Sequence, residues 1–157
     1  MTTFTIHESP VGPLLLTTDG AGLTGLHFPP HDVDASWEHD HAAFTDVIGQ
    51  LDEYFAGTRT EFDIPLHPTG TPFQLKVWDQ LRAIPYGETI SYGALARRVS
   101  SPNASRAVGL ANGRNPIAII IPCHRVIGAD GSLTGYGGGL DRKRFLLGLE
   151  VGAGRLL

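Results

Sequence analysis

The sequence predicts an α+β protein with a small N-terminal unit of strands and one helix, followed by a mostly helical C-terminal unit. Apolar residues alternate between turn signals in the first part of the chain, whereas helical spacing dominates the second part. The 157-residue chain is 41% hydrophobic and can bury a core, and its 20 glycines and 11 prolines indicate many turns. We expect the N-terminal domain at residues 1–66, a linker at 67–71 and the C-terminal domain at 72–157.

The N-terminal unit is expected to contain four strands and one helix. Short apolar runs at 4–7, 14–18 and 23–28 predict strands, and Asp19-Gly20 between two of them is a hairpin signal. The polar, proline-broken stretch 29–40 is expected to be a loop. Helical spacing then predicts a helix that ends at Gly57, with an apolar face of Phe44, Val47, Ile48, Leu51 and Phe55. Alternation over residues 62–66 predicts the last strand.

The C-terminal unit is expected to be built from short helices. Thr71, Pro72 and Gln74 form a capping-box pattern, so a helix should begin there, and its apolar stripe is Phe73, Val77 and Leu81. Further helices are expected at 91–99 and 103–112, across a turn at 101–103, and at 141–150 with Asp141 as N-cap. A β-branched apolar run at 117–121 predicts a buried strand that leads to Cys123, and a glycine-rich loop at 131–139 precedes the last helix.

Charge is divided unevenly along the chain. Residues 1–71 carry eleven acidic residues and one basic residue, whereas residues 72–157 carry eleven basic and five acidic ones. This asymmetry indicates either a basic face that meets a polyanion or two halves that neutralise each other across an interface. The two short helices around residue 101, with Arg97, Arg98 and Arg106 near the turn, fit a DNA-binding helix-turn-helix, but such pairs also occur as plain packing units.

Cys123 is the only cysteine, which excludes an internal disulfide framework and a cysteine-rich zinc site. In a reducing compartment such a residue is a small core hydrophobe, a nucleophile or a chance occurrence. His124 follows it directly, and Glu150 in the last helix could orient that histidine. Cysteine, histidine and carboxylate would supply nucleophile, base and orienting group, so we expect a thiol pKa below the ~8.5 of free cysteine. The alternative is that His124 points away, because neighbours along an extended chain face opposite sides.

From about residue 50 to 150 the chain resembles the methylated-DNA–protein-cysteine methyltransferases, or O6-alkylguanine-DNA alkyltransferases. The segment IPCHRV (121–126) carries the resemblance, with support from GTPFQLKVWDQLRAIPYGETISYGALA (70–96), RAVGLANGRNP (106–116) and GYGGGLDRKRFLLGLE (135–150). The first 45 residues match more loosely, through SPVGPLLL (9–16). The resemblance implies a ribonuclease-H-like N-terminal domain and a C-terminal domain with a helix-turn-helix.

The resemblance also implies a reaction and its residues. The alkyl group of O6-alkylguanine in double-stranded DNA, with O4-alkylthymine as a second substrate class, would pass irreversibly to Cys123. His124 would activate the thiol through a water molecule, and Glu150 would hold that histidine in one tautomer. Asn115 would brace the reactive segment by hydrogen bonds. Because no group could hydrolyse the thioether product, each molecule should act once, without a cofactor.

The damaged base lies inside the duplex, so the nucleotide must be turned out before the thiol can reach it. The resemblance implies that Arg106 fills the place of the extruded guanine and that Tyr92 presses on the neighbouring phosphate. Further DNA contacts are expected at Arg97, Arg98, Ala107 and Gly109. The base pocket is expected to be lined by Val126, Tyr136, Gly137 and Gly138.

Two departures from the family bear on substrate range and metal binding. Ala118 stands where some members carry a proline that helps to hold a bulky aromatic adduct. The N-terminal part lacks the cysteines that some members use for a structural zinc. Six histidines lie outside the signature, and a chance distribution is favoured over a metal site: His7, His27, His31, His39, His41 and His67.

Two other classes of protein stay open on the residues alone. A binding module that flips bases without repairing them would lack the acceptor cysteine, but Cys123 is present. A cysteine hydrolase built on Cys123, His124 and Glu150 would turn over and would not need the basic helix pair. No apolar stretch approaches the ~20 residues that span a bilayer, so we expect a cytoplasmic protein with no membrane partner. The sequence leaves open whether copies associate along DNA.

Overall fold

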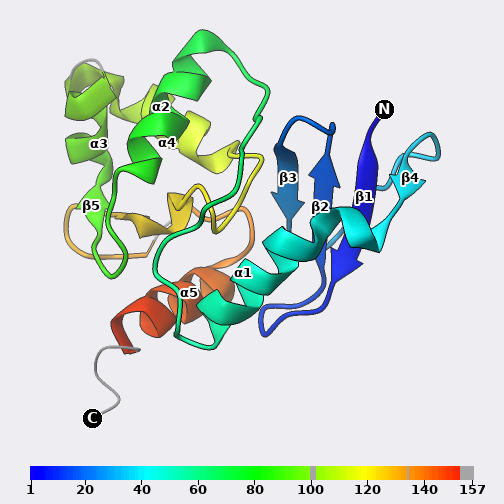
Figure 1. Cartoon of the computed structure of the whole chain (residues 1–157). Helices are drawn as coiled ribbons and strands as arrows, with labels where there is room; N and C mark the ends of the chain where they lie inside the picture. The colour runs from blue at the N-terminus through cyan, green and yellow to red at the C-terminus, as the bar shows by residue number, and fades with distance from the viewer. Residues whose placement is uncertain (100–101, 134, 153–157) are drawn as a thin grey trace. The chain divides into compact units, whose positions relative to one another are not determined.

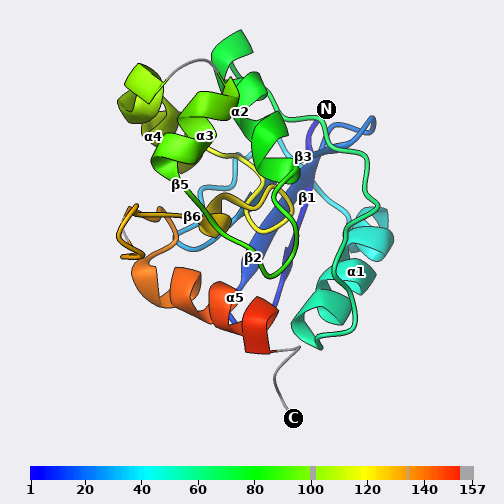
Figure 2. The same ribbon diagram turned by 90° about the vertical axis from the view of Figure 1, so that its left-hand side faces the viewer.

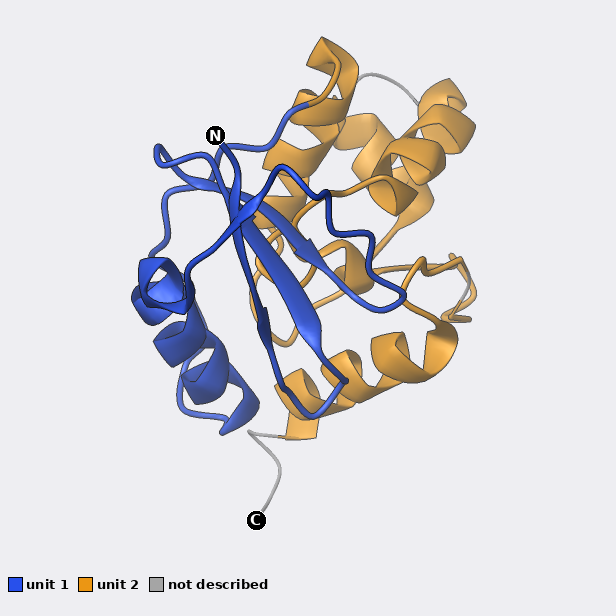
Figure 3. Ribbon diagram, turned by 90° about the vertical axis from the view of Figure 1, so that its right-hand side faces the viewer, with its two compact units in different colours: residues 1–69 blue, residues 70–157 orange. Residues whose placement is uncertain are grey.

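The computed structural model describes residues 1–99, 102–133 and 135–152. The chain divides into two compact units, residues 1–69 and 70–157, and the boundary falls inside the segment expected to be a linker (Figure 3). Strands come first along the chain and helices dominate the rest, so the α+β class is confirmed (Figure 1). Within the described ranges, no helix has the length and apolar character needed to cross a membrane.

A four-stranded sheet of order β3-β2-β1-β4 is the main element of the first unit. Strands β1 (Thr3–His7), β2 (Leu14–Thr18) and β3 (Leu23–His27) pair antiparallel, which confirms the three expected strands to within one residue at each end. The hairpin between β2 and β3 is confirmed too. The Asp19 carboxylate accepts hydrogen bonds of 2.8 and 3.1 Å from the backbone N–H groups of Ala21 and Gly22 and so holds the turn.

Two expectations for this unit were wrong. The stretch 29–40 is not all loop, because β4 (Glu38–His39) pairs in parallel with β1. The alternating run 62–66 is not a strand and makes only an isolated bridge between Leu66 and Leu23. The Leu23 N–H bonds to the Pro65 carbonyl, and the Leu23 carbonyl accepts from the His67 N–H, both at 2.8 Å. Pro65 has no backbone N–H to extend this ladder.

Helix α1 (Thr45–Phe55) is the helix expected from the apolar spacing, and a 3₁₀ turn, η1 (His41–Phe44), precedes it. Its buried residues are Val47, Leu51 and Tyr54. Gly57 follows with a φ of 79°, a left-handed conformation in which glycine is unstrained.

The second unit begins with α2 (Pro72–Arg82), and the expected capping box is confirmed. Thr71 Oγ1 accepts from the Gln74 N–H at 3.1 Å, and Gln74 Oε1 accepts from the Thr71 N–H at 3.0 Å. The buried Trp78 on this helix donates its indole N–H to the carbonyl of Ala111 at 2.9 Å. Ala111 belongs to α4 (Ser105–Gly113), so this bond joins the two helices.

Helix α3 (Tyr92–Val99) packs against α4, and the two lie side by side in Figure 2. Both expected helices are present. The Ser91 hydroxyl caps α3 by accepting from the Ala94 N–H at 3.0 Å. A 3₁₀ turn, η2 (Pro102–Ala104), occupies the first residues of the second predicted helix, so α4 begins two residues later than expected. The expected turn at 101–103 lies partly outside the described residues.

The apolar run 117–121 forms tight turns rather than the expected strand. The Ile120 N–H bonds to the Ala118 carbonyl at 2.8 Å, and the Ile121 N–H bonds to the Ile117 carbonyl at 3.0 Å. Ile119 has a φ of 71°, which is rare for a β-branched residue and incompatible with a strand. The prediction failed because a buried strand and a buried turn present the same apolar, branched composition.

The remaining elements follow Cys123. Strand β6 (Val126–Ile127) pairs in parallel with β5 (Ile90–Ser91), and β5 is the strand that directly precedes α3. The last helix, α5 (Leu140–Gly152), is present as expected, but Asp141 is not its N-cap. The helix begins one residue earlier, and Asp141 instead forms a 2.9 Å ion pair with Arg144. Thr134 in the preceding glycine-rich loop lies outside the described residues.

Candidate active site

Cys123 begins the one-turn helix η3 (Cys123–Arg125), immediately after the turns of residues 117–121. Its N–H bonds to the Ile121 carbonyl at 2.8 Å, and its carbonyl accepts from Asn112 Nδ2 of α4 at 3.4 Å. The residue is only 6% exposed. The thiol is therefore held on a well-braced backbone at the edge of the core.

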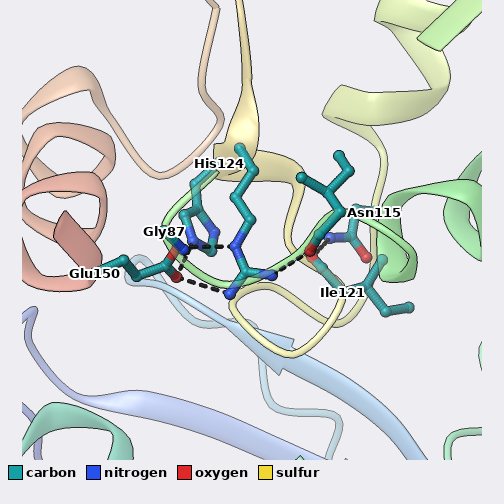
Figure 4. A network of polar contacts seen from close by, with 7 residues as sticks. Gly87, Asn115, Ile121, His124 and Glu150 are labelled. Atoms are coloured by element: carbon teal, nitrogen blue, oxygen red, sulfur yellow. Dashed lines mark hydrogen bonds and ion pairs between the residues drawn. The ribbon is translucent and has the colours of Figure 1, made fainter. Parts of the chain in front are cut away.

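Asn115, which follows α4, ties these turns together. Its Nδ2 donates to the Ile121 carbonyl at 2.7 Å, as Figure 4 shows, and its Oδ1 accepts from the Ile117 N–H at 3.0 Å. The side chain also hydrogen-bonds Cys123 and thereby acts to lower the pKa of the thiol. Asn115 is thus bound to both ends of the segment that leads to Cys123.

His124 and Glu150 form a buried pair, with His124 Nε2 at 2.7 Å from Glu150 Oε2 and exposures of 0% and 3% (Figure 4). Burial raises the pKa of Glu150, but hydrogen bonds from His124 and Arg125 outweigh it and lower the pKa to about 2. An ionised carboxylate can only accept, so we assign the imidazole proton to Nε2. The lone pair then lies on Nδ1, which is buried and has no hydrogen-bond partner among the described residues.

Burial lowers the pKa of His124, and the neighbouring carboxylate offsets this only in part. The imidazole is therefore neutral at pH 7. A neutral imidazole with a fixed tautomer and an available Nδ1 is equipped to accept a proton. Glu150, near the C-terminus of α5, supplies the fixed orientation.

The expectation of a low thiol pKa was wrong for the free protein. Burial raises the pKa of Cys123, although hydrogen bonds from Asn115 and Tyr136 and the charge of Lys143 act in the opposite direction. The deep placement of the sulfur penalises the thiolate more than these groups favour it. The resting thiol is therefore neutral and must lose its proton in the course of a reaction.

Lys143 is a fully buried cation on α5 that the sequence analysis did not single out. Its Nζ donates to the Val126 carbonyl at 2.7 Å and lies 6.0 and 5.9 Å from the ring centroids of Tyr92 and Tyr136. It is the middle one of three consecutive basic residues, 142–144. The available signal was spacing, because Lys143 lies seven residues before Glu150, two turns away on the same helix face.

The expected base-pocket residues thus gather in part around one cation. Val126 and Tyr136 lie beside Lys143, together with Tyr92, which was expected to press on the DNA phosphate. The glycine-rich loop continues from Tyr136 through Gly137 and Gly138. The Gly138 carbonyl accepts from Arg142 at 3.0 Å. In the described part of the chain, no three histidine, cysteine or carboxylate side chains come together as metal ligands.

The other expected DNA-contact residues lie elsewhere, on the surface of α3 and α4. Four of them are exposed: Arg97, Arg98, Arg106 and Ala107. Gly109 is half-buried, and a Cβ there would lie 3.8 Å from the Tyr92 ring, which shows how closely α4 approaches the start of α3. The arginines therefore form no part of the buried cluster around Cys123.

Comparison with known proteins places these features in one family. The ribonuclease-like domain of 6-O-methylguanine DNA methyltransferase matches residues 3–68, and its DNA binding domain matches residues 72–152. The methylated-DNA–protein-cysteine methyltransferase of Mycobacterium tuberculosis is 56% identical over 146 residues, which cover 91% of this chain and 88% of the relative. The enzyme of the same name from Methanosarcina acetivorans is 54% identical over 151 residues, 94% and 97% of the two chains.

Comparison with solved structures leads to the same family. The Mycobacterium tuberculosis O6-methylguanine methyltransferase superposes with a TM-score of 0.91 at 53% identity, covering 98% of this chain and 94% of the other. The structure of Mycobacterium tuberculosis OGT in complex with DNA gives a TM-score of 0.92 at 54% identity, covering 96% and 94%.

Proposed function

Because this chain belongs to the 6-O-methylguanine DNA methyltransferase family, we propose that its Cys123 accepts the alkyl group of O6-alkylguanine in double-stranded DNA. Its curated relatives are methylated-DNA–protein-cysteine methyltransferases, and the protein is a DNA-repair enzyme of that class. One observation carries the assignment of residues. The only cysteine of the chain directly precedes a buried, neutral histidine whose Nδ1 can accept a proton.

The proposed reaction is an in-line displacement at the alkyl carbon. The Cys123 thiol passes its proton through a water molecule to Nδ1 of His124, while the Nε2 proton stays on the imidazole and remains hydrogen-bonded to Glu150. The sulfur–carbon bond forms as the carbon–O6 bond breaks, and the electron pair of the broken bond stays on guanine. Guanine then takes up a proton and is restored, and the protein keeps a thioether.

The environment of the sulfur favours concerted proton loss and attack. Burial holds the thiol neutral at rest, which protects it from unproductive reactions. The cation of Lys143 and the hydrogen bonds from Asn115 and Tyr136 favour the thiolate once the proton leaves. Because a thioether is stable, each molecule acts once.

The surface residues of α3 and α4 complete the proposal. Arg106 is exposed on α4, the second helix of the pair, and would fill the gap left by the extruded nucleotide. The flipped base would enter beside Tyr92, Val126 and Tyr136. O4-alkylthymine is proposed as a second substrate class. A nucleophilic thiol must stay reduced, so the proposal also places the protein in the cytoplasm, with no metal or cofactor required.

Intact-mass analysis tests this proposal directly. Incubation with a duplex that carries O6-methylguanine should add one methyl group to the peptide containing Cys123 and leave unmodified guanine in the DNA. Cys123→Ala should abolish transfer and still bind DNA. Release of methanol over many turnovers would instead identify a cysteine hydrolase, and methylation of another residue would overturn the assignment of Cys123.

A further inference from the structure

Arg125, the last residue of η3, binds the same carboxylate as His124. Its Nε lies 2.8 Å from Glu150 Oε1, and its Nη2 lies 3.0 Å from Glu150 Oε2. Oε2 is the oxygen that also accepts from His124 Nε2, and Oε1 accepts from the Gly87 N–H at 3.4 Å (Figure 4). One carboxylate therefore serves the imidazole and the guanidinium together.

The guanidinium is itself fixed in place. Its Nη1 donates to the Ile84 carbonyl at 2.7 Å, and its carbon lies 5.8 Å from the centroid of the Tyr86 ring. A planar, two-pronged contact determines the plane of the carboxylate as well as its position. The oxygen that meets His124 is thereby held in one orientation, which a single hydrogen bond would not achieve.

The guanidinium also balances charge around the imidazole. Glu150 and Lys143 face His124 from α5, Arg125 faces it from η3, and Tyr86 lies beside Arg125 and Glu150 from the loop before β5. Among these groups only Glu150 favours the imidazolium form. A buried carboxylate without its cation would pull a proton onto His124 and remove the base before the reaction began.

We propose that Arg125 is a positioning residue for alkyl transfer, which holds Glu150 by both carboxylate oxygens and thereby keeps His124 a neutral base. The inference rests on the proposed proton transfer from Cys123 to His124. Arg125 acts through Glu150 and is distinct from the residues that meet the base. Its loss should change the pH at which the enzyme works, beyond any change in stability.

Arg125→Gln removes the charge and keeps a hydrogen-bond donor. Single-turnover methyl transfer, measured from about pH 5 to about pH 9, should show the acid limb moved upward by about one pH unit. Transfer should then be about tenfold slower below the new limb and recover toward the wild-type rate above it. The ring signals of His124 in a nuclear magnetic resonance titration should move by the same amount.

Arg125→Lys and a double variant separate charge from geometry. Arg125→Lys keeps the charge without the two-pronged contact, so transfer should slow at every pH while the acid limb stays in place. In Arg125→Gln/Glu150→Gln the carboxylate is gone as well, and the acid limb should return to its wild-type position. Arg144→Met on the exposed side of α5 is the matched control and should leave the profile unchanged.

An acid limb that does not move in folded Arg125→Gln overturns the proposal, and so does uniform slowing at all pH values in that variant. Circular dichroism checks that each variant is folded. If Arg125→Gln does not fold, Arg125→Met replaces it as the test variant, and the same shift of the acid limb is required. A wild-type protein that transfers no methyl group would contradict the proposed function instead, so the two failures are distinguishable.

Discussion

Lys143 Nζ donates a 2.7 Å hydrogen bond to the backbone carbonyl of Val126 from a fully buried position on α5. Val126 lies three residues after Cys123, so the bond fastens the reactive segment to the last helix. The cation lies close to the rings of Tyr92 and Tyr136, and its charge acts on the thiol. Lys143 therefore both holds the reactive segment in place and lowers the cost of forming the thiolate, although it is not one of the three residues Cys123, His124 and Glu150.

Lys143→Met should slow methyl transfer by about tenfold or more at pH 7, because loss of the cation raises the thiol pKa further. The unpaired Val126 carbonyl should also lower the free energy of unfolding by roughly 1–3 kcal/mol. Single-turnover rates and urea unfolding measure the two effects. The adjacent Arg144→Met, which is exposed, is the control. Equal rates in the two variants would show that the buried charge does not assist the sulfur.

His124→Gln should slow transfer by about 10²–10⁴-fold, because it removes the proton acceptor. The wild-type rate should rise with pH through the pKa of His124, which burial places below its ordinary value of 6.5. The variant should lose that acid limb. His67→Gln in the first unit is a matched control. If the acid limb persists in His124→Gln, another group is the base.

Glu150 should make the protein acid-sensitive. Hydrogen bonds from His124 and Arg125 overcome the effect of burial and depress the pKa of Glu150 from 4.5 to about 2. A depressed carboxyl pKa contributes stability that is present above pH 4.5 and lost as pH falls toward 2. Urea unfolding should show a loss on the order of 3 kcal/mol from this group across that window.

Glu150→Gln should flatten this part of the stability profile while lowering stability at pH 7, since it leaves the Arg125 charge buried without its partner. Asp141→Asn, at an exposed position near the start of α5, is the control and should keep the wild-type acid slope. A wild-type slope in Glu150→Gln would mean that other carboxyls cause the acid loss.

Arg106→Ala should slow transfer from duplex DNA by about tenfold or more, because extrusion of a base costs a few kcal/mol and the arginine would fill the gap. Transfer from a single strand should change little, since no stack must be refilled. Equal losses on both substrates would refute this role. Arg98→Ala should instead weaken binding to any sequence and reduce its salt dependence. A sigmoidal isotherm in these titrations would indicate self-association along DNA.

Local signals in the sequence were enough for the elements that depend on near neighbours. Thr71 and Gln74 cap α2 across three residues, Asp19 holds the turn of a hairpin, and the spacing in α1 needs only one helix face. Such contacts involve residues close along the chain, so composition and periodicity contain the information. The signature around Cys123 pointed to the family in the same way, because it is a contiguous run of residues.

Only the tertiary structure decided the electrostatics of the site. Glu150 meets His124 and Arg125 across more than twenty residues of chain, and Lys143 meets Val126 from another element. A pKa depends on burial and on charges that gather from distant segments, and no local pattern records either. Contacts with residues outside the segment also explain why residues 117–121 were wrongly predicted to form a strand. Their left-handed turn at Ile119 accompanies hydrogen bonds between the Asn115 side chain and both ends of the segment, which apolar composition alone does not reveal.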